Sequence, residues 1–328
     1  MVRKIILFFI FSLMAWSAPL QYLVRTTQAN TAFDVPSTVT SWAAGDDAST
    51  TVNFGFSFPF NNTTYTQVIL SSNGVLNFTT ANTAYANTAL SGPVAQSIYP
   101  YWDDLIRTGG TGANGTITYG TMGTAGVDRR FVVTWTNMRH YNNTAKRYTF
   151  QAVLYEDGKI IMRYLDSSDA DGTRAATNNP GATVGVQESG TNYDQYSYDA
   201  AFNEAVDVVY YPLPIIVVTK NSCVLNDPIN GTTNPKRIPG ATIRYAVQVT
   251  NTGIGAASNV FATDALSSIF NAPTIPKVAT GACNCAAGGG TASGSVSGND
   301  ITINYGSVAT GTIAAPTREC GYFEAIIK

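Results

Sequence analysis

The stretch Phe150-Gln151-Ala152-Val153-Leu154-Tyr155 leads through Glu156-Asp157-Gly158 into a second apolar run, Lys159–Tyr164. In the first run Phe150, Ala152 and Leu154 alternate with the other three residues. A period of two places one face of a strand on a core and leaves the other face partly wet. Because Asp-Gly tolerates the positive φ angles of a tight turn, this stretch predicts a β-hairpin with one buried face.

The same pattern extends from about Thr51 to Tyr211, where short alternating or β-branched runs are separated by Asn, Gly and Asp. No helical period is sustained, and Ser72-Asn73-Gly74 marks another tight turn. The predicted strands of this region are residues 64–70, 74–78, 115–119, 130–137, 148–155, 159–164, 183–187 and 206–211.

Pro212-Leu213-Pro214 interrupts the pattern, because proline lacks a backbone donor and restricts the residue before it. A chain of 328 residues has room for two domains. We therefore predict a first domain at 18–211, a hinge at 212–214 and a second domain at 215–328. Strands predicted at 215–220, 241–251, 259–263, 301–305 and 322–327 fit an immunoglobulin-like sandwich. The predicted fold class is all-β, with two β-sandwich domains in tandem.

The N-terminus has the pattern of a secretory signal. Two basic residues, Arg3 and Lys4, precede an apolar run from Ile5 to Trp16 that is shorter than the roughly 20 residues of a membrane-spanning helix. We predict cleavage after Ser17, which leaves no transmembrane segment and a secreted or cell-surface chain. The alternative is an uncleaved anchor, since the bulky Trp16 lies next to the predicted cut.

The composition favours an extracellular β-protein. Charged residues make up 12 % of the chain, against a usual figure of about 25 %, and the net charge is −2. Lysine and arginine are scattered singly, so the sequence shows no basic footprint for nucleic acid or anionic lipid. Nucleic acid is therefore rejected as a partner.

The four cysteines all lie in the last third of the chain. An even number of cysteines in an exported protein favours disulfides, with a thiolate zinc site as the alternative. Cys283 and Cys285 are too close in sequence to pair comfortably with each other. We therefore predict that one of them pairs with Cys223 and the other with Cys320, without deciding which.

The first domain resembles the extracellular nidogen-like domain. The resemblance, placed at about 51–211, implies a β-rich module of matrix and cell-surface proteins, hence adhesion or matrix contact, and it supplies no catalytic residues. It rests on the order and spacing of Phe54-Gly55-Phe56-Ser57-Phe58-Pro59-Phe60, Ser71-Ser72-Asn73-Gly74, Tyr99-Pro100-Tyr101-Trp102-Asp103-Asp104-Leu105 and Arg130-Phe131-Val132-Val133-Thr134-Trp135.

The second domain is similar to the bacterial conserved repeat domain, an immunoglobulin-like module of surface proteins. This resemblance implies a bacterial origin and a role in presenting the first domain, although such modules usually recur in tandem and this chain has one. It rests on Val218-Thr219-Lys220, the run from Ile238 to Tyr245, Val249-Thr250-Asn251-Thr252-Gly253 and Thr263-Asp264.

Two groups of acidic residues are candidate calcium ligands. Asp166, Asp169 and Asp171 lie in one polar turn, and calcium requires several oxygen ligands gathered in this way. The spacing is not that of an EF-hand, so an ordinary exposed loop is the alternative. Asp103 and Asp104 could form a second oxygen-rich site, but a turn in which a carboxylate caps backbone amides is the favoured interpretation.

Tyr193, Tyr196 and Tyr198 are candidate binding residues, because exposed aromatic rings serve as rigid anchors for sugars and proteins. Packing in the sandwich is the alternative. His140 is the single histidine and lies in a polar stretch without a nucleophile motif, so we predict no enzyme activity.

The sequence therefore predicts a non-catalytic secreted or cell-surface protein whose first domain contacts an extracellular protein or glycan. One alternative is a structural subunit that associates with copies of itself through edge strands. The other is a carbohydrate-active enzyme, since paired carboxylates need no histidine.

Overall fold

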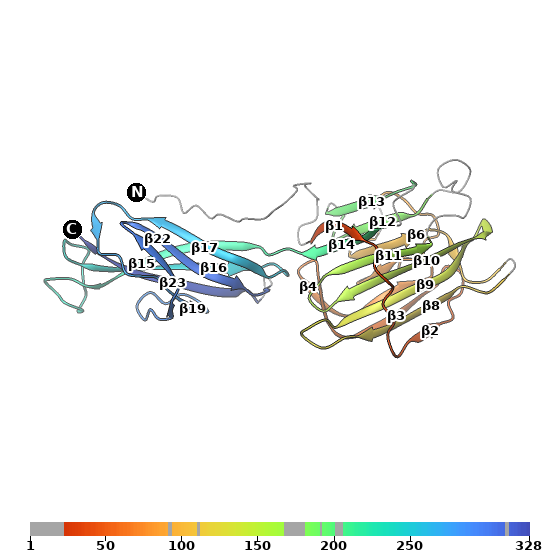
Figure 1. The fold of residues 1–328 in the computed structure, drawn as a ribbon, viewed down its shortest axis with the longest axis horizontal. Coiled ribbons are helices and arrows are strands. Elements are labelled where there is room, and N and C mark those ends of the chain that lie inside the picture. Colours follow the sequence, from red (N-terminus) through yellow and green to blue (C-terminus); the bar gives the residue numbers. More distant parts are fainter. Residues whose placement is uncertain are drawn as a thin grey trace. The chain divides into compact units, whose positions relative to one another are not determined.

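A computed structural model of the chain describes residues 23–90, 94–109, 112–166, 181–190, 192–200, 206–311 and 315–328. Every regular element in these residues is a β-strand, and the sheets are antiparallel (Figure 1), which confirms the predicted all-β class. The described residues contain no helix with the length and apolarity to cross a membrane. The predicted signal peptide, residues 1–17, lies outside the described residues.

The chain divides into two compact units between Pro212 and Leu213, at the predicted hinge. Pro212 is the last residue of a first-domain strand, where it pairs with Leu23. Leu213 belongs to the second unit, because its carbonyl accepts a hydrogen bond of 3.0 Å from the amide of Gly255.

The first domain consists of a larger and a smaller sheet. The strand order in the larger sheet is β1 (Leu23–Ala29), β14 (Val206–Pro212), β11 (Ile160–Asp166), β10 (Asn143–Tyr155), β9 (Arg130–His140), β8 (Thr116–Met122) and β2 (Thr40–Trp42), and β7 (Leu105–Ile106) also pairs with β9. The order in the smaller sheet is β13 (Tyr193–Ser197), β12 (Thr183–Gln187), β6 (Ser97–Trp102), β5 (Leu76–Asn77), β4 (Thr63–Ser71) and β3 (Ser49–Phe60).

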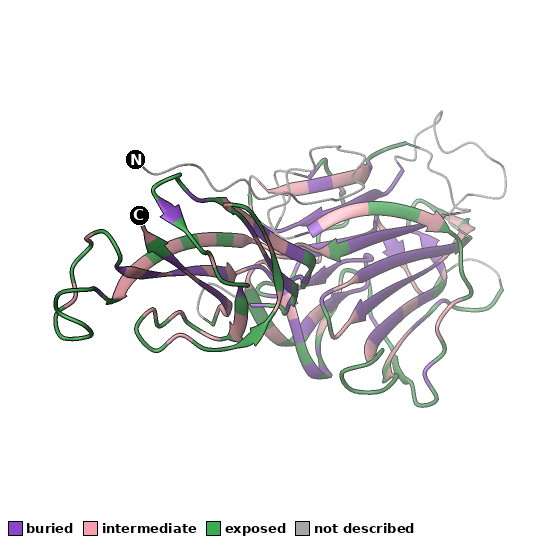
Figure 2. Cartoon of the chain, turned by 60° about the vertical axis from the view of Figure 1, so that its left-hand side comes forward, coloured by how far each residue is buried: buried purple, intermediate pink, exposed green. Residues whose placement is uncertain are grey.

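An aromatic core lies between these two sheets. Strand β3 alternates strictly, so Phe54, Phe56, Phe58 and Phe60 are buried while the residues between them are largely exposed. The ring of Phe54 lies 5.2 Å from that of Phe131 on β9, which brings the sheets into contact. Figure 2 shows the resulting concentration of buried residues on the strands of this domain.

The predicted hairpin is confirmed, with Val153 of β10 opposite Ile161 of β11. The prediction that one face of it is partly wet is wrong at Gln151 and Val153, which are both buried. The physical reason at Gln151 is the segment of residues 30–39, here called the crossing segment, whose Asp34 forms hydrogen bonds with the Gln151 side chain on the outer face of the larger sheet.

The crossing segment connects strands at opposite edges of the larger sheet. Strands β1 and β2 are six positions apart, which is roughly 29 Å at the usual strand spacing. The chain from Ala29 to Thr40 reaches at most about 40 Å when extended, so the segment crosses the sheet by a nearly direct path. It fits closely at β8, where a Cβ added to Gly120 would lie 2.4 Å from the carbonyl oxygen of Thr38.

The second domain is also a pair of sheets packed face to face. One has the order β15 (Ile216–Asn226), β16 (Thr242–Asn251), β23 (Thr317–Ile327), β19 (Lys277–Thr280) and β20 (Thr291–Ala292), with β18 (Phe270–Asn271) paired to β23. The other has the order β17 (Ala257–Ala265), β22 (Asp300–Val308) and β21 (Gly294–Ser297). Ile243, Val247, Ile301, Ile303 and Phe323 are part of the apolar core between them.

The cysteines pair as Cys223–Cys285 and Cys283–Cys320, with Cα atoms 6.0 and 5.2 Å apart. The prediction that the two loop cysteines reach different partners is confirmed, and the structure decides which partner each one takes. The two bonds fasten the loop between β19 and β20 to β15 and to β23.

Candidate functional site

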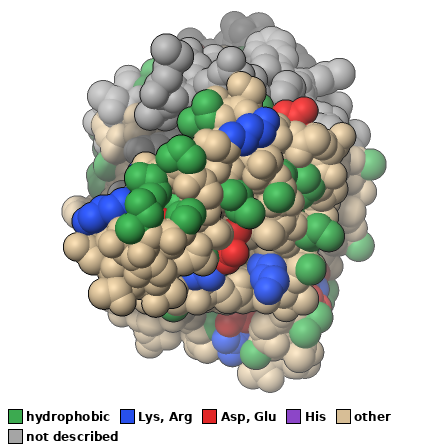
Figure 3. Space-filling view, turned by 90° about the vertical axis from the view of Figure 1, so that its left-hand side faces the viewer, with side chains coloured by type: hydrophobic (Ala, Val, Ile, Leu, Met, Phe, Trp, Pro, Cys, Tyr) green, Lys and Arg blue, Asp and Glu red, His purple; other side chains and the backbone are tan. Residues whose placement is uncertain are grey.

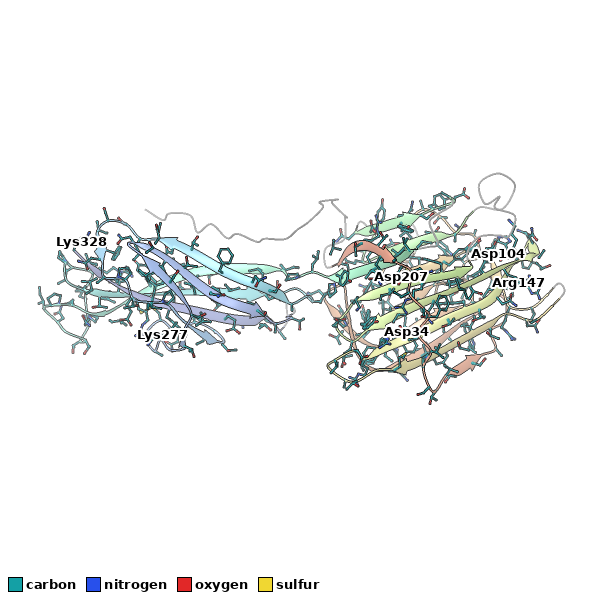
Figure 4. The ribbon with its side chains drawn as sticks, viewed as in Figure 1. Asp34, Asp104, Arg147, Asp207, Lys277 and Lys328 are labelled. Atoms are coloured by element: carbon teal, nitrogen blue, oxygen red, sulfur yellow. A yellow bond between two sulfur atoms is a disulfide. The ribbon has the colours of Figure 1, made fainter. Side chains whose placement is uncertain are left out.

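Three carboxylates meet at one end of the first domain. Asp46 and Asp47 lie in the loop before β3, and Asp104 lies between β6 and β7. One oxygen from each can be chosen so that all three lie within 4.8 Å of one another. We call Asp46, Asp47 and Asp104 the acidic loop end, and Figure 4 shows Asp104 at one end of the strands of this domain.

The buried side chain of Asn73 holds these loops together. Its amide nitrogen donates to Oδ1 of Asp47 at 2.7 Å and to the carbonyl of Thr83 at 3.2 Å. Its Oδ1 accepts the backbone amide of Leu105 at 3.1 Å, next to Asp104. The predicted tight turn at Asn73-Gly74 therefore brings carboxylates that are distant in sequence into one cluster.

Gly74 is required at this turn. Its φ is +73°, and an added Cβ would lie 2.0 Å from the carbonyl oxygen of Tyr101. A side chain at this position would push β6 away from the turn, and Asp104 is the second residue after the end of β6.

The carboxylates of the acidic loop end repel one another when they are ionised. Burial raises the pKa of Asp46 above its ordinary value, and the charge of Asp47 raises it further. Burial also raises the pKa of Asp104, and the charges of Asp47, Asp103 and Asp46 add to this while His140 opposes it. A hard cation bound by these oxygens would relieve the repulsion.

Asp103 is not part of this cluster although it is adjacent to Asp104. It is buried, and its Oδ1 accepts the backbone amide of Asp104 at 2.9 Å and lies 3.5 Å from Nε2 of His140. Nδ1 of His140 accepts the amide of Asn142 at 3.0 Å. Both ring nitrogens are thus occupied, and Asp103 caps the turn, as in the favoured interpretation. Of the predicted Asp103–Asp104 pair, only Asp104 contributes to the carboxylate cluster.

Of the other predicted calcium ligands, the structure describes only the backbone of Asp166. The backbone of Asp166 pairs with Thr149 in the sheet, and Asp169 and Asp171 lie outside the described residues. Calcium binding at Asp166, Asp169 and Asp171 stays a prediction.

Two exposed aromatic residues belong to segments that hydrogen-bond with residues 102–104. The amide of Tyr141 donates to the carbonyl of Asp104 at 2.9 Å, and its side chain is exposed. Tyr85, also exposed, follows Ala84, whose carbonyl accepts the indole N–H of the buried Trp102 at 2.8 Å. Sequence reasoning missed Asp46, Asp47, Tyr85 and Tyr141. The Asp46-Asp47 pair was a visible signal, but nothing local indicated its neighbours.

The predicted binding tyrosines have three different environments. Tyr193 packs against a buried cluster that includes Tyr99 and Trp102. The guanidinium of Arg25 lies 5.3 Å from the centre of the Tyr196 ring. Tyr198 is the most exposed of the three. Ligand binding by Tyr193, Tyr196 and Tyr198 stays a prediction.

Two disulfides tie the second domain, and disulfides persist in oxidising compartments such as the extracellular space. A family model described as NIDO related matches residues 21–214, more than half of the chain. The chain belongs to this family, which confirms the nidogen-like resemblance of the first domain and indicates an extracellular module. No curated protein and no solved structure matches the chain.

Proposed function

We propose that this protein is a non-catalytic extracellular contact protein, and that its first domain binds a protein or glycan ligand through the acidic loop end. The observation that carries the proposal is the crowding of Asp46, Asp47 and Asp104 within 4.8 Å of one another, with the exposed Tyr141 hydrogen-bonded through its backbone amide to the carbonyl of Asp104. Carboxylates and aromatic rings are side chains that recognise cationic groups and sugar rings.

The acidic loop end contrasts with five acidic residues of the chain that form ion pairs with lysine or arginine. Asp34 is paired with Arg130 and Arg163, Asp194 with Arg25, Glu156 with Arg129, Asp264 with Lys220, and Glu324 with Arg244. Within the described ranges, no lysine or arginine forms an ion pair with Asp46, Asp47 or Asp104. The guanidinium of Arg107 lies nearby, but it donates to the carbonyl of Ala44 at 3.2 Å.

The cation that we propose for this cluster is calcium. Calcium takes six to eight oxygen ligands, and three carboxylates supply part of such a set. The remaining ligands would be water, backbone carbonyls or hydroxyl groups of the bound ligand. Contact through this end would then depend on calcium.

The test is an array of glycans and extracellular matrix proteins, probed with the purified chain in calcium and in chelator. We expect binding in calcium that is lost in the triple variant Asp46→Asn, Asp47→Asn, Asp104→Asn. The matched control is Asp157→Asn with Asp300→Asn, which removes exposed acids elsewhere. A blank array, or equal binding by the triple variant, would overturn the proposal.

A further inference from the structure

Two oppositely charged side chains of the second domain face its core. Charged side chains are sparse on the face of the molecule that Figure 3 shows, whereas Lys220 of β15 and Asp264 of β17 are turned inward. Lys220 pairs across its sheet with Val247, and Asp264 pairs with Ile301. Both of these partners belong to the apolar core, and residues that pair across two strands lie on the same face of the sheet. The lysine and the aspartate therefore project between the two sheets.

Their side chains meet at one side of the sandwich. Strands β15 and β17 each come first in the strand order of their own sheet, and Nζ of Lys220 donates a hydrogen bond to Oδ2 of Asp264. The Asp264 side chain is 11 % exposed and that of Lys220 is 26 % exposed. Within the described residues, the Asp264 carboxylate accepts no other hydrogen bond. The amine from one sheet thus contacts an oxygen that is bonded directly to the carboxyl carbon from the other.

Two stacked aromatic rings hold the amine at this carboxylate. Nζ of Lys220 lies 4.5 Å from the ring centre of Tyr245 and 5.9 Å from that of Phe323, and the two ring centres are 5.0 Å apart. Such rings attract the ammonium group and restrict its motion. Two groups held in contact react as parts of one molecule, which corresponds to effective concentrations of roughly 10⁵–10⁸ M when the groups are well oriented.

The amine distinguishes this pair from the other ion pairs of the chain. Where both partners are described, the other carboxylates are paired with guanidinium or imidazole groups. A guanidinium keeps its proton in proteins, whereas a lysine amine that loses its proton is a nucleophile toward carbonyl carbon. One proton that moves from Nζ of Lys220 to Oδ2 of Asp264 along their hydrogen bond leaves a neutral amine beside a neutral carboxyl group. These are the forms that can condense.

We propose that Lys220 and Asp264 condense into an amide bond that joins the two sheets of the second domain. Nζ forms a bond to Cγ of Asp264, one carbon–oxygen bond breaks, and that oxygen leaves as water with two of the three ammonium protons. The two charges cancel, and no oxidant, reductant or cofactor is consumed. None of the four cysteines lies on β17, β22 or β21, so the amide links the sheet that the disulfides do not reach.

The mass of the intact chain tests this bond. After reduction of the disulfides, we expect the purified protein to be lighter by one water molecule than the sequence that starts at its observed N-terminus. Tryptic digestion should leave the chain uncut after Lys220 and yield two peptides linked through Lys220 and Asp264, because trypsin does not cleave after an acylated lysine. A chain of full mass that releases an unmodified peptide ending at Lys220 would overturn the proposal.

Two lysine variants locate the lost water. Lys220→Arg keeps the positive charge beside Asp264 but cannot form this amide, so its reduced chain should have the full mass of its sequence. The matched control Lys277→Arg changes an exposed lysine of the same domain and should remain lighter by one water molecule. A loss of water that persists in Lys220→Arg would place the dehydration at another residue and refute the proposal. The linked peptide of the unchanged chain decides the question even where the variant is unstable.

Discussion

The guanidinium Nη1 of Arg163 lies 2.8 Å from Oδ2 of Asp34, and this ion pair holds the crossing segment against the larger sheet of the first domain. Arg130 donates to both oxygens of the same carboxylate, at 2.9 and 3.0 Å. The amide and carbonyl of Asp34 form two 2.9 Å hydrogen bonds with the Gln151 side chain, much as a neighbouring strand would. One residue thus fixes the middle of a segment that joins both edges of the sheet.

Removing the Asp34 carboxylate should weaken the first domain. Asp34→Ala removes the 2.8 Å partner of the buried Arg163, which keeps Asp207 at 3.4 Å. The loss should therefore fall at the lower end of the roughly 3–5 kcal/mol that breaking a buried ion pair costs. We expect a loss of about 3 kcal/mol in the free energy of unfolding, measured by denaturant titration of tryptophan fluorescence. The control Asp300→Asn should change it by less than about 0.5 kcal/mol. Equal stability of the two variants would show that the segment is held by other contacts.

Acid should loosen the same segment. Burial raises the pKa of Asp34, but hydrogen bonds from Arg130 and Arg163 outweigh this effect and lower its pKa below the ordinary 3.8. Its stabilising contribution is therefore complete above the unfolded pKa and is lost as pH falls through the lower folded pKa. Hydrogen exchange of residues 30–39 should accelerate below about pH 3.8 relative to the β10–β11 hairpin. A uniform acceleration across the domain would contradict this account.

Calcium should stabilise the first domain through the acidic loop end. At a free concentration of 100 times its Kd, a ligand that binds only the folded state adds about 2.7 kcal/mol. We expect a rise in melting temperature with calcium that Asp104→Asn abolishes and Asp157→Asn preserves. An increase that survives Asp104→Asn would place the calcium at another site.

Each disulfide should contribute strongly to the second domain. Cys223–Cys285 and Cys283–Cys320 close loops with sequence separations of 62 and 37, and loops of this length correspond to about 4 kcal/mol each. Cys223→Ser with Cys285→Ser should lower the free energy of unfolding slightly more than Cys283→Ser with Cys320→Ser. Peptide mapping without reduction checks the pairing, and recovery of a Cys223–Cys320 peptide would contradict the structure.

The sequence predicted strands best where their signals were local. The β10–β11 hairpin follows from a period of two and an Asp-Gly turn, and β12 was predicted at its observed bounds, Thr183–Gln187. Strand β6 (Ser97–Trp102) was not predicted, because all six of its residues are buried and it contains Pro100. Proline is excluded from a regular central strand, but here the pairing of β6 with β12 contains a register shift that accommodates it.

The candidate site was only partly accessible from the sequence. Asp104 was predicted as a cation ligand, whereas Asp46 and Asp47 were not, since they lie more than fifty residues earlier in the chain. Asn73 brings them together through hydrogen bonds to Asp47 and Leu105. Such contacts depend on how the sheets pair, so the local hydrophobic period of a strand does not predict them.

The sequence by itself determined that this protein is built of β-strands in two sandwiches, that the two loop cysteines take different partners, and that the first domain belongs with nidogen-like modules. Alternation, turn residues and spacing carry this information, because each acts over a few neighbouring residues. Only the tertiary structure decided that Asp34 covers Gln151 and that Asp104, but not Asp103, joins Asp46 and Asp47. These relations join residues far apart in sequence, so they exist only once the sheets have formed.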